Sequence, residues 1–328
     1  MGETTFHGQD IPPFPDDVPT HPLLVIDYEK LKQGEKLEKV SRASSIHCAA
    51  GSLKNHNVDI QPMWEMGEAT MALPLDVKMN FEQGDGGRSF GYKAAGTTNT
   101  DEHGSLDTVE FINVSKDDAL AWPKIVHREY PITVTTRMSS IKKFIQESDA
   151  VLRTMLDIMS EYLDLPVNTL RDRHVFGNHS GSECRVIRNP PKRVPGDQVA
   201  LGAHTDFGSL VGFQYKSNER FLSNPSAQSF LHHNIIGGLQ VLNVASKGWE
   251  YVKNKRPHAT AVMEPLTESP LVASSVAAKP IHIDKGVTAG EWFNRRVKYQ
   301  RAANRTGPEA WRASRGTENA RLELASAS

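Results

Sequence analysis

Apolar residues recur at helical spacing in two stretches of the chain. Between about residues 137 and 162 they lie mainly three or four positions apart, until Pro166 interrupts the pattern. This spacing puts them on one face and predicts a long amphipathic helix. In residues 63–79 the same spacing is interrupted by Pro74, which predicts two helical pieces that meet at the proline.

Short apolar runs bounded by glycine, proline and polar residues predict strands. The expected strand segments are residues 23–27, 88–92, 107–111, 184–187, 199–201, 209–213 and 239–242. Helices followed by short strands are typical of an α+β protein with a helix-flanked antiparallel barrel, rather than of a doubly wound sheet. The glycine-rich run 84–87 lacks a Gly-Lys-Ser/Thr ending, so we interpret it as a flexible loop and not as a phosphate-binding loop.

The C-terminal stretch 291–315 combines basic residues with three aromatic side chains, Trp292, Phe293 and Trp311. This composition could bind a phosphate-bearing partner. We favour a solvated amphipathic helix whose aromatic residues pack on the barrel.

Charge, hydropathy and cysteine content narrow the class of protein. The 38 basic and 39 acidic residues nearly cancel, which excludes a nucleic-acid partner held by a basic field. No apolar run is long enough to span a bilayer and residues 1–13 lack a secretory signal, so we expect a soluble, cytoplasmic monomer with no membrane contact. Cys48 and Cys184 are expected to be free thiols in a reducing compartment.

The motif with the clearest chemistry is His204-Thr205-Asp206, which follows the apolar residues 199–203. In a strand, residues i and i+2 point to the same face, so His204 and Asp206 would project side by side. An imidazole and a carboxylate are two of the three ligands in the iron triad of two histidines and one carboxylate. By itself the spacing also fits a hydrogen-bonded pair without a metal.

Three blocks in order extend this motif: residues 201–210, the segment Gly237-Gly238-Leu239-Gln240-Val241-Leu242, and the segment Trp249-Glu250-Tyr251-Val252. Together they resemble the isopenicillin N synthase-like branch of the iron(II)- and 2-oxoglutarate-dependent dioxygenases, especially its fungal members. The resemblance covers most of the chain, including residues 53–56, 71–74, 88–92, 109–111 and 311–318.

The resemblance implies a double-stranded β-helix (jelly-roll) barrel flanked by helices. It also implies Fe(2+) bound by His204 and Asp206, 2-oxoglutarate as co-substrate, molecular oxygen, and a small-molecule substrate. The reaction would be hydroxylation, desaturation or ring closure, in secondary metabolism or in catabolism of a small molecule. It implies an N-terminal dioxygenase region in residues 1–130, the jelly-roll core in 131–290 and a C-terminal tail in 291–328.

The chain departs from the family in the segment that completes the iron site. Members supply a second histidine from a His-Arg-Val-type segment, and an arginine in an Arg-x-Ser pattern pairs with 2-oxoglutarate. Neither residue is found in this chain. The stretch of sequence that carries both in family members is missing near residues 259–266. The third ligand is therefore not identified, and the barrel is expected to be incomplete. We interpret His258 and His282 as ordinary surface histidines.

A second departure is an insertion at residues 211–228. Its removal would join Leu210 to Ser229 and restore the family's apolar strand. Because valine codons begin with GT and a glutamine codon can be CAG, we hypothesise that Val211 to Gln228 is a translated intron. Residues 45–51 also lack the aromatic strand of the family, and residues 185–190 do not match its Asn-x-Tyr co-substrate contact.

These departures leave two interpretations open. The first is an Fe(II)- and 2-oxoglutarate-dependent oxidoreductase. The second is a catalytically inactive oxygenase-fold relic or binding protein, because two protein ligands without the second histidine should hold iron weakly.

Overall fold

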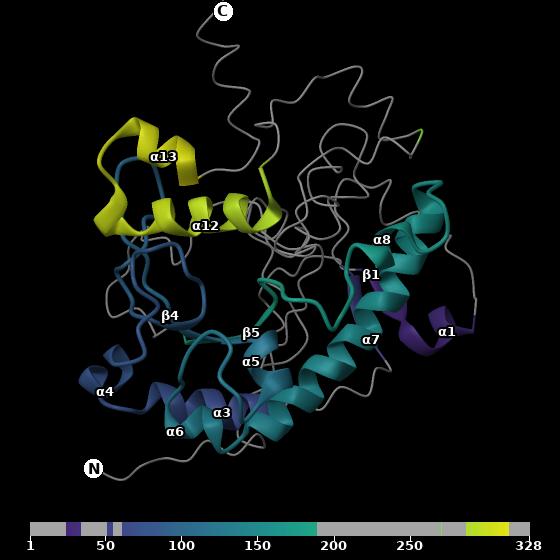
Figure 1. Cartoon of the computed structure of the whole chain (residues 1–328), viewed down its shortest axis with the longest axis horizontal. Coiled ribbons are helices and arrows are strands. Elements are labelled where there is room, and N and C mark those ends of the chain that lie inside the picture. Colours follow the sequence, from purple (N-terminus) through teal and green to yellow (C-terminus); the bar gives the residue numbers. More distant parts are fainter. Residues whose placement is uncertain (1–23, 34–50, 55–60, 189–269, 271–286, 315–328) are drawn as a thin grey trace, which may run out of the picture.

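The structure, a computed structural model, describes residues 24–33, 51–54, 61–188, 270 and 287–314 (Figure 1). Helices lie between the described strands and follow the last of them. The described elements are β1 (Leu24–Asp27), α1 (Tyr28–Lys32), β2 (Gly51–Lys54), α3 (Gln61–Met71), α4 (Leu75–Met79), β3 (Gly91–Lys93), β4 (Glu110–Ser115), α5 (Lys116–Ala121), α6 (Ile132–Thr135), α7 (Met138–Tyr162), α8 (Thr169–Asp172), β5 (Glu183–Arg188), α12 (Ala289–Gln300), the 3₁₀ turn η2 (Ala302–Asn304) and α13 (Pro308–Ser314).

The main sheet has three antiparallel strands in the order β3-β4-β5. Ile112 in the central strand lies opposite Tyr92 on one side and Val186 on the other. A separate parallel pair joins β1 and β2. The sheet confirms the antiparallel, helix-flanked architecture in part. The other strands expected for the jelly roll, at 199–201, 209–213 and 239–242, lie outside the described residues.

The helices expected from apolar spacing are confirmed. The long helix α7 occupies nearly the whole stretch in which that spacing continues. The first amphipathic stretch is divided into α3 and α4, and Pro74 is the N-cap residue of α4. Since proline has no backbone N–H to donate, it suits the start of a helix and interrupts its interior.

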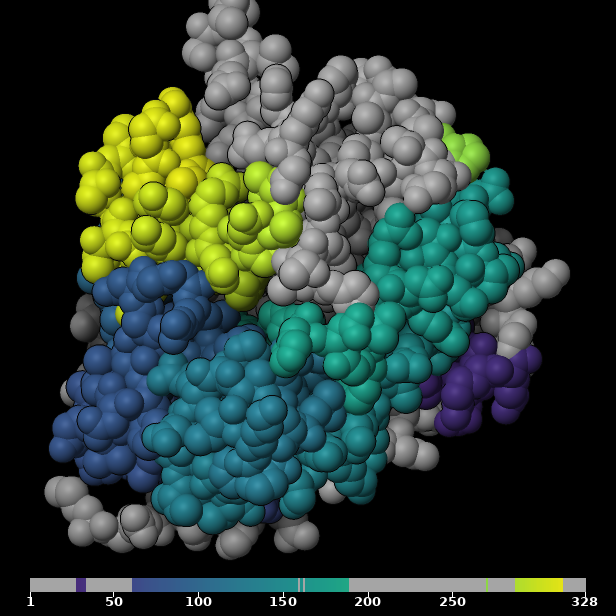
Figure 2. Space-filling view, in the orientation of Figure 1, coloured from purple at the N-terminus to yellow at the C-terminus, as the bar shows by residue number. Residues whose placement is uncertain are grey.

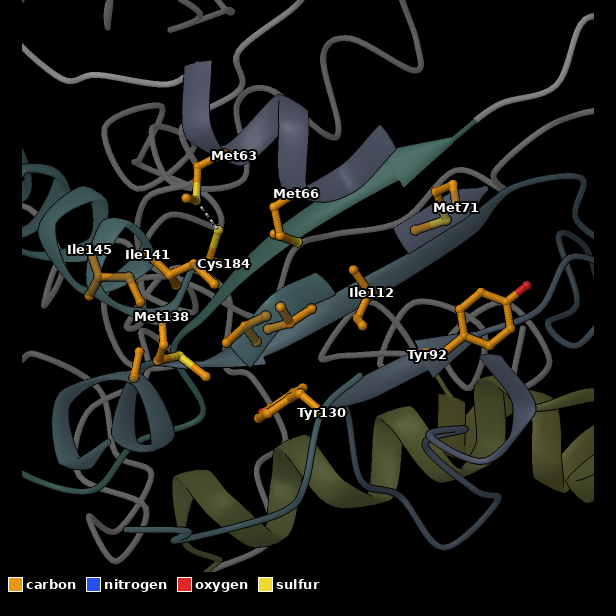
Figure 3. Packing of buried hydrophobic residues seen from close by; sticks show 13 residues of the cluster. Met63, Met66, Met71, Tyr92, Ile112, Tyr130, Met138, Ile141, Ile145 and Cys184 are labelled. Atoms are coloured by element: carbon orange, nitrogen blue, oxygen red, sulfur yellow. Dashed lines mark hydrogen bonds between the residues drawn. The ribbon is translucent and has the colours of Figure 1, made fainter. Parts of the chain in front are cut away.

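One apolar core lies between α3, the sheet and α7 (Figure 3). Met66 from α3, Ile112 from β4 and Ile141 from α7 each expose 1% or less of their surface. Gly67 allows the close approach of α3 to the sheet, because a Cβ atom there would lie 2.2 Å from Val186 Cγ1. The cysteine of β5, Cys184, is buried in this core as a free thiol, as expected.

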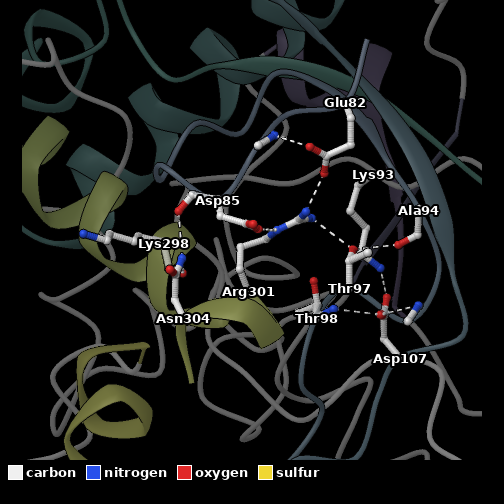
Figure 4. A network of polar contacts seen from close by, with 12 residues as sticks. Glu82, Asp85, Lys93, Ala94, Thr97, Thr98, Asp107, Lys298, Arg301 and Asn304 are labelled. Atoms are coloured by element: carbon white, nitrogen blue, oxygen red, sulfur yellow. Dashed lines mark hydrogen bonds and ion pairs between the residues drawn. The ribbon is translucent and has the colours of Figure 1, made fainter. Parts of the chain in front are cut away.

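The C-terminal helices lie beside residues 97–99, and in Figure 1 α12 and α3 are on opposite sides of the sheet. The surface of the C-terminal helices, yellow in Figure 2, adjoins that of the blue N-terminal part of the described chain. Trp292 is buried in a small apolar cluster with Ala289, Val287 and Phe293 of the same segment, so burial of this aromatic residue is confirmed, whereas its packing on the barrel stays a prediction. The expected single solvated helix is wrong in two respects. The segment breaks at η2 into α12 and α13, and Arg296 and Arg301 are buried at 1% and 5% exposure. Arg301 donates to Asp85 and Glu82 and to Thr97 (Figure 4), so charge pairing compensates its burial.

None of the helices in the described ranges combines the length and the apolar composition needed to cross a membrane. Even α7, with 25 residues, carries charged side chains along its whole length.

A buried ion pair joins α4 to the central strand. Lys78 Nζ lies 2.8 Å from Glu110 Oε2, and the Tyr92 hydroxyl donates to the same oxygen at 2.5 Å. Burial alone would raise the pKa of Glu110, but the hydrogen bonds from Lys78 and Tyr92, with the nearby charges, hold it below its usual value. The carboxylate form is therefore the form that stabilises the folded protein.

The pKa of Glu110 is lower in the folded chain than in the unfolded chain. The stabilisation that its carboxylate gives to the folded state is therefore complete above the unfolded pKa of about 4.3, and it is lost as the pH falls below that value. Glu110→Gln should lower the free energy of unfolding by about 1.5–3 kcal/mol at pH 7, the range for hydrogen bonds to charged groups. Urea unfolding from pH 7 to pH 3.5 should show the gap to wild type narrowing in acid. A gap that stays constant over this range would contradict the assignment.

Candidate metal centre

The two iron ligands expected from the sequence, His204 and Asp206, lie outside the described residues. The same is true of the insertion 211–228, of the junction near 259–266, and of His258 and His282. The assignment of His204 and Asp206 as iron ligands therefore stays a prediction.

Within the described part of the chain, Asp117, His127 and His179 form a group that could hold a metal ion. Their ligand atoms all lie within 4.8 Å of one another. Both rings contact the same carboxylate oxygen, because His127 Nε2 is 3.0 Å and His179 Nδ1 is 3.2 Å from Asp117 Oδ2. Asp117 is buried, whereas the side chains of His127 and His179 are 34% and 76% exposed.

Asp117 is positioned by the end of β4 and the start of α5. The strand ends at Ser115, which is the N-cap residue of α5, and its hydroxyl accepts from Asp117 N at 3.1 Å and from Asp118 N at 3.4 Å. Serine favours this position because its short side chain can satisfy the free N–H groups of the first turn. The cap places Asp117 in the first turn of α5, directly after the end of the central strand.

Asp118 holds the segment that carries His127. Its Oδ1 accepts from Val126 N at 2.8 Å and from His127 N at 2.7 Å, and its Oδ2 accepts from the Tyr130 hydroxyl at 2.9 Å. Tyr130 in turn accepts from Ser115 N at 3.0 Å. The backbone of His127 is thus fixed by the neighbour of Asp117, independently of the contact between the two side chains.

Lys116 holds the segment that carries His179. Its Nζ donates to Phe176 O and Asn178 O, both at 2.8 Å, and it also lies 2.8 Å from Asp117 Oδ1. Ser180 N donates to Asp117 Oδ2 at 3.1 Å. Residues on either side of Asp117 therefore fix both histidine segments.

The carboxylate of Asp117 is stabilised in its ionised form. Burial alone would raise its pKa, but hydrogen bonds from His127 and Lys116, the charge of Lys116 and the N–H of Ser180 outweigh burial and hold the pKa well below its usual value. The group therefore presents an anionic oxygen and two imidazole nitrogens, which are donors that divalent transition metals accept.

The sequence did not identify this group. Asp117 and His179 are 62 positions apart, and no spacing typical of a metal motif connects them. The antiparallel pairing of β4 with β5, the contacts of Lys116 and the hydrogen bond from Ser180 N bring the two segments together. The one local signal was Ser115 ahead of two aspartates, which predicts a helix start and not a ligand set.

No family model matches the chain. Among solved structures, full-length Neurospora crassa T7H in complex with alpha-KG is similar over 84% of this chain and 95% of its own, with a TM-score of 0.54 and 17% sequence identity. Its complexes with alpha-KG and 5-formyluracil and with alpha-KG and thymine give TM-scores of 0.53 and 0.51, at 17% and 16% identity. At such identity the likeness shows the fold alone. It supports the jelly-roll expectation, of which the described strands form one partial sheet.

Proposed function

We propose that this chain is an Fe(II)- and 2-oxoglutarate-dependent oxygenase in which His204 and Asp206 are two of the iron ligands. One observation carries the proposal: the fold shared with T7H, a protein solved with alpha-KG, accompanies a His-x-Asp motif with the donor types of the iron triad. The fold alone does not define an activity, so the motif is an essential part of the argument.

The two donors present match two of the three positions in the iron triad. An imidazole and a carboxylate two residues apart on a strand project to one face and leave positions open on the ion for co-substrate and oxygen. When bound, iron with 2-oxoglutarate supplies the oxidising chemistry. The protein contributes the ligand geometry and a cavity that excludes water.

For the substrate we propose a small molecule that is hydroxylated, desaturated or cyclised, in secondary metabolism. We further propose that the protein is a cytoplasmic monomer, with an N-terminal region in 1–130, the oxygenase core in 131–290 and a tail in 291–328.

A second candidate function is a non-catalytic relic or binding protein with the same fold. The observation that favours it is the missing sequence near residues 259–266, where the second histidine and the 2-oxoglutarate arginine are expected. The two candidates differ in one property, which is turnover of 2-oxoglutarate.

The test is succinate release from 2-oxoglutarate by the purified chain, with Fe(II) under air, measured by mass spectrometry. The same assay is run on a form that lacks residues 211–228. Iron-dependent succinate release by either form supports the oxygenase. If neither form releases succinate or binds iron, the relic is the better account. Activity only in the shortened form would also support the intron hypothesis. Sequencing of the transcript tests that hypothesis separately, because cDNA that always retains residues 211–228 would contradict it.

A further inference from the structure

We propose that Asp117, His127 and His179 form a second site, for a divalent transition metal such as Zn²⁺, separate from the iron site proposed at His204 and Asp206. The proposal rests on the positions of three ligand atoms from three different segments of the chain. They come from the start of α5, from the segment before α6 and from the segment before β5.

The distances suit a small ion. Zinc bonds of about 2.0–2.1 Å in tetrahedral geometry place neighbouring ligand atoms roughly 3.3–3.5 Å apart. The two nitrogen–oxygen distances at Asp117 are 3.0 and 3.2 Å, and the two imidazole nitrogens are at most 4.8 Å apart. An ion could therefore bind all three atoms after small movements of the two rings.

The hydrogen-bonding pattern favours exchange of protons for a metal. Without a metal, His127 Nε2 and His179 Nδ1 must each carry a proton in order to donate to the same oxygen of Asp117. Metal binding removes protons from such nitrogens and uses their lone pairs. One ion would then replace two separate hydrogen bonds at a single carboxylate oxygen.

The site is preorganised and open to solvent. The neighbours of Asp117 fix the backbone of both histidine segments: Asp118 accepts from His127 N, and Lys116 donates to Phe176 O and Asn178 O. Little ordering remains to oppose binding. The exposed ring of His179 provides an entry path, and three protein ligands leave a fourth position for water.

Lys116 limits the strength of the site. Its ammonium group lies 2.8 Å from Asp117 Oδ1, so only Oδ2 is available to the ion, and the positive charge opposes a second cation. We therefore expect reversible binding that is weaker than in enclosed structural zinc sites. Bound zinc would join α5 to the segment before α6, which carries His127, and to the segment before β5, which carries His179.

The experiment is Zn²⁺ titration by isothermal calorimetry on the full chain without an affinity tag, carrying His204→Ala and Asp206→Ala. Because both proposed iron ligands are absent from this background, failure of the oxygenase proposal would not affect the result. Addition of His179→Ala should remove one zinc equivalent or weaken its binding at least about 10-fold. His179 is mostly exposed and Asp117 Oδ2 keeps its contacts with His127 and Ser180, so this variant should still fold without zinc.

The matched control is His103→Ala, since the ring of His103 is 81% exposed and its ion-pair partner is the exposed Glu102. It should leave the zinc equivalent in place. His127→Ala should reproduce the loss seen with His179→Ala. Zinc binding that is unchanged by both substitutions would overturn the proposal, as would the absence of any zinc binding by the background chain.

Discussion

Asp107→Ala is expected to lower the free energy of unfolding by about 3–5 kcal/mol, the range for breaking a buried ion pair from one side. The side chains of Asp107 and Lys93 form an ion pair in which each is only 1% exposed (Figure 4). Asp107 Oδ1 also accepts from Gly96 N and Thr98 N, both at 3.1 Å. The alanine variant would leave the buried Lys93 side chain without its counter-charge and two backbone N–H groups without the carboxylate that they donate to.

Two further variants separate the ion pair from general damage to the loop. Glu102→Ala alters an exposed carboxylate in the same loop and should change stability by no more than about 0.5 kcal/mol. Lys93→Met combined with Asp107→Asn removes both charges and keeps an acceptor for the backbone, so it should be more stable than Asp107→Ala. Urea unfolding measures all three. A loss below about 1 kcal/mol for Asp107→Ala would refute the buried-pair account.

The second large effect is expected at the proposed iron ligands. His204→Ala or Asp206→Ala should reduce Fe(II)-dependent succinate release at least about 100-fold, because loss of a direct ligand should exceed the 10–100-fold loss caused by outer partners of a metal site. The measurement is succinate formation together with iron retained after dialysis, in the form of the chain that shows activity.

Thr205→Ala is the matched control. In a strand, residue 205 points to the opposite face from His204 and Asp206, so it should not reach the ion. Activity and iron content should stay close to wild type. Equal losses in all three variants would mean that the segment is needed for folding and does not ligate iron.

The helices were predictable from sequence because their evidence is local. Met138, Ile141 and Ile145 recur at helical spacing, and all three are buried on one face of α7. Pro74 separated α3 from α4 for a similarly local reason. The burial of Arg301 could not be predicted, because its partners Glu82 and Asp85 lie more than 200 residues earlier in the chain.

The candidate metal centre was not predictable for the same reason. His127 and Asp117 are 10 positions apart. Their contact depends on the hydrogen bonds from Val126 N and His127 N to Asp118, which hold this segment against α5. His179 reaches the site because Lys116 and Asp117 bind the segment before β5 through Phe176 O, Asn178 O and Ser180 N. Long-range pairing, and not a motif, creates this site. The iron ligands were inferred in the opposite way, from a local motif without long-range evidence.

The most direct test of the oxygenase assignment is a crystal structure of the chain with Fe(II) and 2-oxoglutarate, grown without oxygen, with anomalous scattering measured at the iron absorption edge. The account predicts an iron peak within bonding distance of His204 and Asp206, with 2-oxoglutarate on the same ion. A well-ordered His204-Thr205-Asp206 segment with no iron peak beside it would contradict the account.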